Sequence, residues 1–205
     1  MAGTEHWDDI YSTKPSESVS WYQEHSTVSL DLINRAGLGS RGRFIDVGAG
    51  ASRLVDELLS RDLASAVLVD ISQSALAVTR QRLGEIAVVE YIAGDVLELD
   101  TGPVDLWHDR ALFHFLGDST ERKAYVEVAS RHVVAGGHAV VAAFAEDGPE
   151  YCSGLPTQRY SDVQLAALFA PSFSLVTSRR ETHVTPDGRE QPFIYVLLQK
   201  ADNKD

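Results

Sequence analysis

The sequence is poor in cysteine and has no long apolar run. Cys152 is the single cysteine, which excludes an internal disulfide and a cysteine-based zinc site. Such cysteine usage suits a reducing compartment. No apolar run approaches the roughly 20 residues that span a bilayer, and residues 1–10 lack the apolar core of a signal peptide. We therefore expect a cytoplasmic protein that does not enter a membrane.

Positive charge is also scarce. The chain has 18 Lys and Arg against 30 Asp and Glu, a formal net charge of −12. Affinity for nucleic acids and for anionic membrane surfaces depends on clustered cations, so we expect neither kind of partner. A positively charged ligand or partner is tolerated better. The seven histidines form no i, i+4 pair, and no metal site is predicted.

What the sequence does contain is a regular alternation of apolar strands and helices. Its 205 residues suit a single domain. The pattern predicts a doubly wound α/β fold with a mostly parallel sheet of seven strands, the last of which run in an antiparallel hairpin. Residues 1–40 differ from the rest, being polar with two short helical stretches. The expected strands cover residues 43–47, 66–69, 88–92, 104–107, 138–144, 173–184 and 193–199, with a turn at Pro186-Asp187-Gly188.

In such sheets, ligands bind outside the carboxyl ends of the strands. Gly48 and Gly50 follow the first strand, where they allow a sharp turn and a close approach of a ligand. Asp70 stands twenty residues after Gly50, at the end of the second strand, where a carboxylate can accept hydrogen bonds from ribose hydroxyls. Asp95 and Val96 follow the third strand and are candidates to hold an adenine ring. A common Gly-Asp turn is the alternative there.

The residues around the first turn distinguish between nucleotides. A carboxylate at Asp46 would repel a pyrophosphate, and Arg53 occupies the last position of the glycine pattern that dinucleotides prefer. These two residues argue against a nicotinamide-dependent oxidoreductase. A cofactor with adenosine, an ammonium group and a sulfonium, such as S-adenosylmethionine, suits Asp46 better.

Three segments together resemble the class I S-adenosylmethionine-dependent methyltransferases: Phe44 to Gly50, Val67 to Ser72, and Gly94 to Val96. The resemblance extends over residues 40–145 and implies a Rossmann-like methyltransferase fold for residues 41–205. It also implies a methyltransferase activity with S-adenosylmethionine as cofactor. Ala51 departs from the pattern, which often has a third glycine. By this resemblance the cofactor is held by Asp46, Gly48, Gly50, Asp70, Ile71, Asp95 and Val96.

The N-terminal segment has a narrower likeness. His6 to Tyr11, Val19 to Gln23 and Gly50 to Ser52 are similar to a methyltransferase branch that includes protein lysine methyltransferases. In that branch the N-terminal segment folds over the cofactor. The likeness implies that residues 1–40 form a helical lid and that Trp21 contacts the cofactor. The alternative is that these aromatic residues only pack the N-terminal helix, and the two roles are compatible.

Candidate catalytic residues follow the fourth expected strand, where the family places the transferred methyl group. His108 and His114 could accept a proton from the acceptor, since a free imidazole titrates near pH 6.5. Asp109 could orient one of them or accept an ammonium group. The structural alternatives are an ion pair between Asp109 and Arg110 and a core position for His114.

The segment 147–160 is expected to be a loop that closes over the acceptor, with Cys152 as a buried apolar side chain rather than a nucleophile.

Several aromatic residues would line the acceptor pocket, which favours a small-molecule acceptor. A lysine on another protein is the alternative, favoured by the acidic charge. An NAD-dependent oxidoreductase and a non-catalytic cofactor-binding module also stay open, and the sequence says nothing on oligomeric state. The expected pocket aromatics are Trp7, Tyr11, Trp21, Tyr22, Phe113 and Tyr151.

Overall fold

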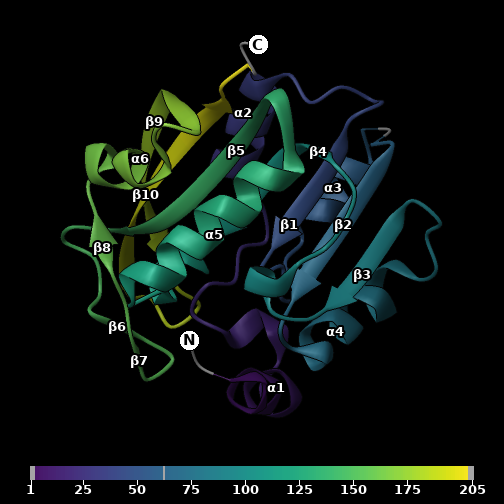
Figure 1. Cartoon of the computed structure of the whole chain (residues 1–205). Helices are drawn as coiled ribbons and strands as arrows, with labels where there is room; N and C mark the ends of the chain where they lie inside the picture. Colours follow the sequence, from purple (N-terminus) through teal and green to yellow (C-terminus); the bar gives the residue numbers. More distant parts are fainter. Residues whose placement is uncertain (1–2, 62, 203–205) are drawn as a thin grey trace.

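A computed structural model describes residues 3–61 and 63–202 of the chain (Figure 1). The helices are α1 (Thr4–Thr13), α2 (Thr27–Ala36), α3 (Leu54–Leu59), α4 (Gln73–Leu83), α5 (Ser119–His132) and α6 (Asp162–Phe169), with short 3-10 turns η1 (Ser16–Ser18), η2 (Val96–Glu98) and η3 (Phe113–Phe115). The strands are β1 (Arg43–Val47), β2 (Ser65–Asp70), β3 (Val89–Ala93), β4 (Val104–Arg110), β5 (Val133–Ala145), β6 (Tyr151–Cys152), β7 (Leu155–Pro156), β8 (Arg159–Tyr160), β9 (Phe173–Val184) and β10 (Glu190–Lys200).

The main sheet has the strand order β3-β2-β1-β4-β5-β10-β9, and β8 pairs briefly with β5. The strands β1 to β5 pair in parallel, and β10 runs antiparallel between β5 and β9. The predicted Rossmann-like fold is confirmed. The strand order reverses between β1 and β4, so a crevice opens at the carboxyl ends of these two strands.

Two layers of helices cover the sheet because its central strands are apolar on both faces. Ile45 of β1 packs with residues of α5 and α6 on one face, whereas Phe44 packs with residues of α2, α3 and α4 on the other. Successive side chains of a strand point to opposite faces, which explains this division. Figure 1 shows α5 crossing the front of the sheet, with α3 behind it.

Strand β4 is longer than predicted. It was expected to end at Trp107, but it continues through Arg110 because both neighbouring strands keep pairing with it. His108 and Asp109 therefore lie within the strand, opposite Asp46 and Val47 of β1. The alternative of an ion pair between Asp109 and Arg110 is wrong, since adjacent strand residues point to opposite faces.

Helix α1 is attached beside the sheet edge through α4. The Oδ1 atom of Asp8 accepts hydrogen bonds from the Ser72 hydroxyl (2.6 Å) and the Ser74 amide (3.1 Å) at the start of α4. Figure 1 shows α1, in purple, next to α4. The segment after α1 reaches the C-terminal hairpin, where the Nε2 atom of His183 lies 2.8 Å from the Ser20 carbonyl oxygen. His183 is thereby buried.

Candidate active site

Two adjoining cavities open at the carboxyl ends of β1, β2 and β4. The space between their lining atoms, part of it open to solvent, amounts to about 730 and 540 Å³. Four residues line both cavities: Tyr11, Trp21, Gly48 and Arg110. The larger cavity is also lined by Trp7, Val69, Asp70, Ile71, Gly94, Asp95, Val96, Ala111, Leu112, Phe115 and Cys152. The smaller cavity is also lined by Ser16, Val19, Tyr22, Gln23, Ser26, Asp46, Ala49, Ala51, Ser52 and His108.

The turn after β1 depends on its two glycines. Gly48 and Gly50 have φ angles of 65° and 53°, the left-handed region that L side chains rarely adopt. A β-carbon on Gly48 would collide with the Leu112 side chain, and one on Gly50 would collide with the Tyr11 hydroxyl. The turn is thus held between the N-terminal segment and the loop after β4, in a conformation that needs glycine.

Asp70 ends β2 beside this turn. Its Oδ2 atom accepts a hydrogen bond from the Gly50 amide (2.7 Å), and its Oδ1 atom accepts one from the Ser72 amide (2.8 Å). Burial raises the pKa of Asp70 to about 6, although the two amide donors favour the charged form. A carboxylate has about four acceptor positions. Two therefore stay available for hydroxyl groups in the larger cavity, which Asp70 lines.

Asp95, Val96 and Ile71 line the same cavity, as the sequence predicted for an adenosine site. The Oδ1 atom of Asp95 accepts from the Leu97 amide (2.9 Å), which caps the short turn η2. The structure therefore brings Asp70, Ile71, Asp95 and Val96 together around one cavity.

Asp46 belongs to the smaller cavity and is fixed by a histidine. Its Oδ1 atom lies 2.6 Å from Nδ1 of His108, and Nε2 of His108 lies 2.9 Å from the Ser29 hydroxyl of α2. All three side chains are buried. Both ring nitrogens of His108 are occupied, so the ring orients Asp46 and has no free nitrogen to take a proton from a ligand.

Asp109 lies on the opposite face of the sheet and lines neither cavity. It accepts hydrogen bonds from the amides of Leu112 and Phe113 and from the Tyr125 hydroxyl (2.5 Å). Burial raises its pKa to about 6. These contacts fix the chain after β4, so Asp109 shapes the wall of the larger cavity without touching it.

His114 is also remote from both cavities. It is fully buried, it stacks on Phe144 with ring centroids 4.4 Å apart, and its ring nitrogens have no hydrogen-bond partner among the described residues. Burial lowers its pKa to about 3, so the ring is neutral at physiological pH. The structure thus places His114 in the core position that the sequence offered as the alternative to a catalytic role.

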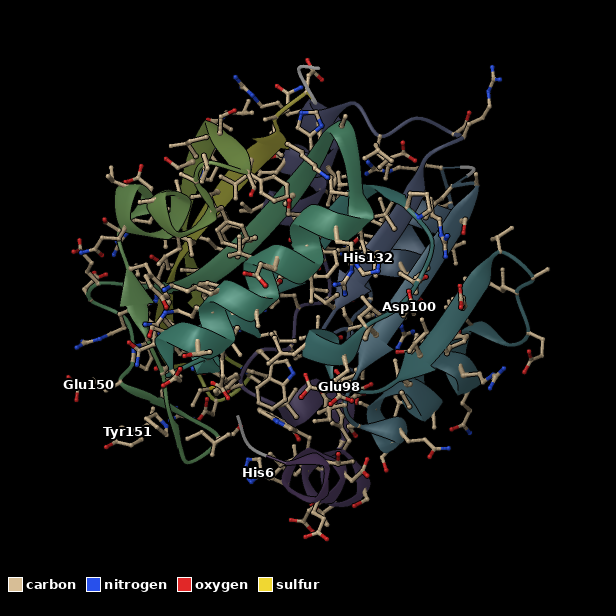
Figure 2. All side chains as sticks on the ribbon, viewed as in Figure 1. His6, Glu98, Asp100, His132, Glu150 and Tyr151 are labelled. Atoms are coloured by element: carbon tan, nitrogen blue, oxygen red, sulfur yellow. The ribbon has the colours of Figure 1, made fainter. Side chains whose placement is uncertain are left out.

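The aromatic walls differ in part from those expected. Trp21 donates a hydrogen bond from Nε1 to the Tyr11 hydroxyl (3.0 Å), and Trp7 packs edge-on against Phe115. Phe113 is buried in the core instead. Tyr151 is 65% exposed and lies at the periphery in Figure 2, so its predicted place in the pocket is wrong.

Three wall residues were not among the site residues predicted from the sequence: Arg110, the last residue of β4, and Ala111 and Leu112 directly after it. Arg110 was weighed only as an ion-pair partner of Asp109. No motif singles it out, because its contacts come from segments distant in the chain. Cys152 is buried as predicted but also lines the larger cavity, and burial raises the pKa of its thiol.

Within the described part of the chain, no group of three His, Cys, Asp or Glu side chains is arranged to hold a metal ion. No helix there is both long and apolar enough to cross a membrane.

Comparison with known proteins agrees with this geometry. Residues 44–137, a little under half of the chain, match a family model described as a methyltransferase domain. No curated protein matches the chain.

Among solved structures, the chain is similar to one described as converting a disulfide bond into a thioacetal group during echinomycin biosynthesis. The identity is 20% and the TM-score 0.75, over 98% of this chain and 94% of that one. It is also similar to a Burkholderia thailandensis 1,6-didemethyltoxoflavin N1-methyltransferase with its substrate and S-adenosylhomocysteine bound, with 21% identity and a TM-score of 0.71 over 97% of this chain and 84% of that one. A third is the N-methyltransferase NodS of Bradyrhizobium japonicum with S-adenosylhomocysteine, with 13% identity and a TM-score of 0.72 over 95% and 98% of the two chains.

The charged groups that line the cavities indicate the kind of ligand that the site favours. Three carboxylates line them, Asp46, Asp70 and Asp95, and among the described lining residues Arg110 is the only Arg or Lys. Such a site suits a cofactor with a cationic amino-acid arm and offers little to a pyrophosphate. Residues 44–137 match the model of a methyltransferase domain, and the chain has the fold of S-adenosylmethionine-dependent methyltransferases.

Proposed function

We propose that the chain transfers a methyl group from S-adenosylmethionine to a small organic acceptor. The observation that carries this proposal is the pair of adjoining cavities, with an acidic lining around a glycine turn at the carboxyl ends of β1 and β2. The methyltransferase domain at residues 44–137 overlaps this turn and supports the proposal.

The cofactor would lie across both cavities. In this arrangement Asp70 holds the ribose, and Ile71, Asp95 and Val96 contact the adenine. The amino-acid arm lies in the smaller cavity, where Asp46 faces its ammonium group beside Gly48 and Gly50. Trp21, which lines both cavities, covers the junction.

Residues 1–40 act as a lid in this proposal, and residues 41–205 form the catalytic domain. Support comes from Asp8, which attaches α1 to α4, and from Tyr11 and Trp21, which form a wall common to both cavities. The lid excludes water from the reacting atoms, which strengthens the electrostatic interactions inside the site.

Bound S-adenosylmethionine would supply an electrophilic methyl group on a sulfonium, with S-adenosylhomocysteine as the product. The protein's contribution is to hold the acceptor in line with that methyl group. Neither His114 nor Asp109 reaches the larger cavity, and His108 has both nitrogens occupied. We therefore assign His108 a positioning role on Asp46, and the acceptor loses its proton without help from these three side chains.

A small molecule fits the enclosed aromatic wall formed by Trp7, Trp21 and Phe115 better than a protein segment. The structural neighbours include an enzyme with 1,6-didemethyltoxoflavin bound, which supports the same acceptor class. A lysine on a basic protein is the second candidate, and the net charge of −12 favours it. We place the reaction in the cytoplasm, since Cys152 is a free thiol.

Two experiments test this function. Calorimetric titration should show binding of S-adenosylhomocysteine and none of NAD; the reverse result would overturn the cofactor assignment. A lysate from the source organism incubated with the protein and methyl-labelled S-adenosylmethionine should then gain label in small molecules. Label confined to protein bands would favour the lysine alternative, and cofactor binding without any transfer would indicate a non-catalytic module.

A further inference from the structure

Arg110 has an unusual environment for a cation. Its side chain is 9% exposed, and it lines both cavities at the end of β4. Nε donates to the Tyr195 hydroxyl (2.8 Å) and Nη1 donates to the Trp21 carbonyl oxygen (2.9 Å), while the guanidinium carbon lies 4.5 Å above the Phe193 ring. Nη2 is buried and has no hydrogen-bond partner among the described residues. A buried donor without a partner is costly, and because Arg110 belongs to the walls of both cavities, a ligand bound there can supply the missing acceptor.

The carboxylate nearest to this guanidinium is already engaged. Glu181 accepts hydrogen bonds from the Tyr195 hydroxyl (2.6 Å) and from Nε2 of Gln23 (3.0 Å), and it lies 3.9 Å from Nη2 of Arg110. That separation makes an ion pair but is too long for a hydrogen bond, so Nη2 still has a donor to offer. These contacts hold the guanidinium in one orientation, so little side-chain entropy is lost when an anion binds it.

We infer that Arg110 binds an anionic oxygen group of the methyl acceptor, and that the acceptor is a flat, largely apolar acid such as an aromatic carboxylate or a phenolate. The other walls fit this class, since Trp7, Phe115 and Leu112 offer apolar surface beside the single cation.

The inference rests on the proposed function and explains how the acceptor can react although His108, Asp109 and His114 are not placed to take its proton. An acceptor that arrives ionised needs no histidine to remove its proton. A neighbouring guanidinium favours the ionised form, because an opposite charge within about 4–6 Å lowers the pKa of an acid. The net charge of −12 makes the surface repel anions. A preference for anions would therefore be local to this site.

The test measures how strongly the complex with S-adenosylhomocysteine prefers an acid over its neutral amide. Suitable matched probes are benzoate and benzamide, 2-naphthoate and 2-naphthamide, and indole-2-carboxylate and its amide. We expect at least one acid to bind ten times or more tighter than its amide to the wild type. In Arg110→Gln this ratio should fall to about one, and in Arg110→Lys part of it should remain. Arg179→Gln, which removes an exposed charge from β9, should keep the full ratio.

Equal affinity for every acid and its amide, including no binding of either, would overturn the inference without needing any variant to fold. Loss of the preference in Arg179→Gln would show a general charge effect and would also overturn it. The cofactor's own carboxylate is the rival partner of Arg110. If Arg110→Gln weakens the binding of S-adenosylhomocysteine tenfold but leaves the binding of methylthioadenosine unchanged, Arg110 binds the carboxylate of the cofactor instead. Failure of the wild type to bind S-adenosylhomocysteine at all would instead contradict the proposed function.

Discussion

The Nδ1 atom of His108 lies 2.6 Å from Oδ1 of Asp46, and the two side chains face each other across the paired strands β1 and β4. Ser29 contacts the other nitrogen of the ring. The chain of three buried groups connects α2 to the smaller cavity. The orientation of the Asp46 carboxylate in this cavity therefore depends on the histidine.

Replacing His108 with Ala should therefore weaken binding of S-adenosylhomocysteine more than it slows the methyl transfer step. Ser29→Ala removes only the outer hydrogen bond, worth about 1 kcal/mol, and should have a smaller effect of the same kind. Binding is measured by calorimetry and turnover at saturating cofactor. A fall in kcat with unchanged cofactor affinity would show that His108 takes part in the chemical step.

Asp70→Ala should weaken the binding of S-adenosylhomocysteine by more than tenfold. The substitution removes charge-assisted hydrogen bonds to the ribose, each worth roughly 1.5–3 kcal/mol. Asp100→Ala is the matched control, because Asp100 is exposed and lines neither cavity (Figure 2). Unchanged affinity in a folded Asp70→Ala protein would refute the ribose assignment.

The pH dependence of binding and of stability should run in opposite directions. The pKa of Asp70 is raised from 3.8 to about 6. Cofactor affinity should therefore fall as the pH drops below 6, because the Asp70 side chain becomes protonated. The folded state binds more protons than the unfolded state between about pH 4 and 6. The contribution of Asp70 to the free energy of unfolding therefore falls as the pH rises through that window, by at most about 1.4 kcal/mol per pH unit.

Asp109 has a pKa raised to about 6 by the same cause, so it adds to the stability trend but not to the affinity trend. The Asp70→Asn variant should bind S-adenosylhomocysteine more weakly. The contributions of Asp70 to the pH dependence of affinity and to the pH dependence of stability should both disappear. Affinity that stays constant from pH 7.5 to 5 in the wild type would contradict the role given to Asp70.

Gly50→Ala should be destabilising for two reasons that can be separated. At its φ angle of 53°, a residue with a β-carbon destabilises the fold by roughly 1–2 kcal/mol. The added carbon would also collide with the Tyr11 hydroxyl. Tyr11→Phe removes the hydroxyl, so the double variant should lose less than the sum of the two single losses in denaturant unfolding. Gly188→Ala, with a φ of 83° and open space around it, measures the backbone cost alone. Strict additivity would show that Tyr11 and Gly50 do not touch.

His114→Phe should keep turnover within about threefold of the wild type and should not lower the melting temperature by more than a few degrees. The ring is neutral, stacked on Phe144 and without a hydrogen-bond partner among the described residues. Leaving a buried polar group unsatisfied costs roughly 1–3 kcal/mol, which an apolar ring recovers in part. A large fall in kcat with intact cofactor affinity would restore His114 as a base.

The first three strands could be predicted because they are short runs, mostly apolar, that end in aspartate or are followed by glycine. Asp46 and Asp70 stand at the ends of two such runs, which places them at one edge of a parallel sheet. The last residues of β4 could not be predicted in the same way. His108, Asp109 and Arg110 are polar, and only pairing with β1 and β5 keeps them in the strand.

The environments of single side chains depend on contacts between distant segments, which sequence patterns do not reveal. His183 is buried because Ser20, 163 residues away, lies against it. Tyr151 is exposed because it lies on a separate two-stranded hairpin outside the main sheet. Arg110 is held by Trp21 and Tyr195, from opposite ends of the chain.

The wall of Tyr11, Trp21, Gly48 and Arg110 that both cavities share has a thermodynamic consequence. The cofactor, which would lie across both cavities, and the methyl acceptor beside Arg110 would both meet these side chains. Binding of one therefore changes the affinity for the other, and linkage requires the factor to be the same in both directions. Bound S-adenosylhomocysteine would thus change how tightly the methylated acceptor is retained, and the methylated acceptor would change the affinity for S-adenosylhomocysteine by that same factor.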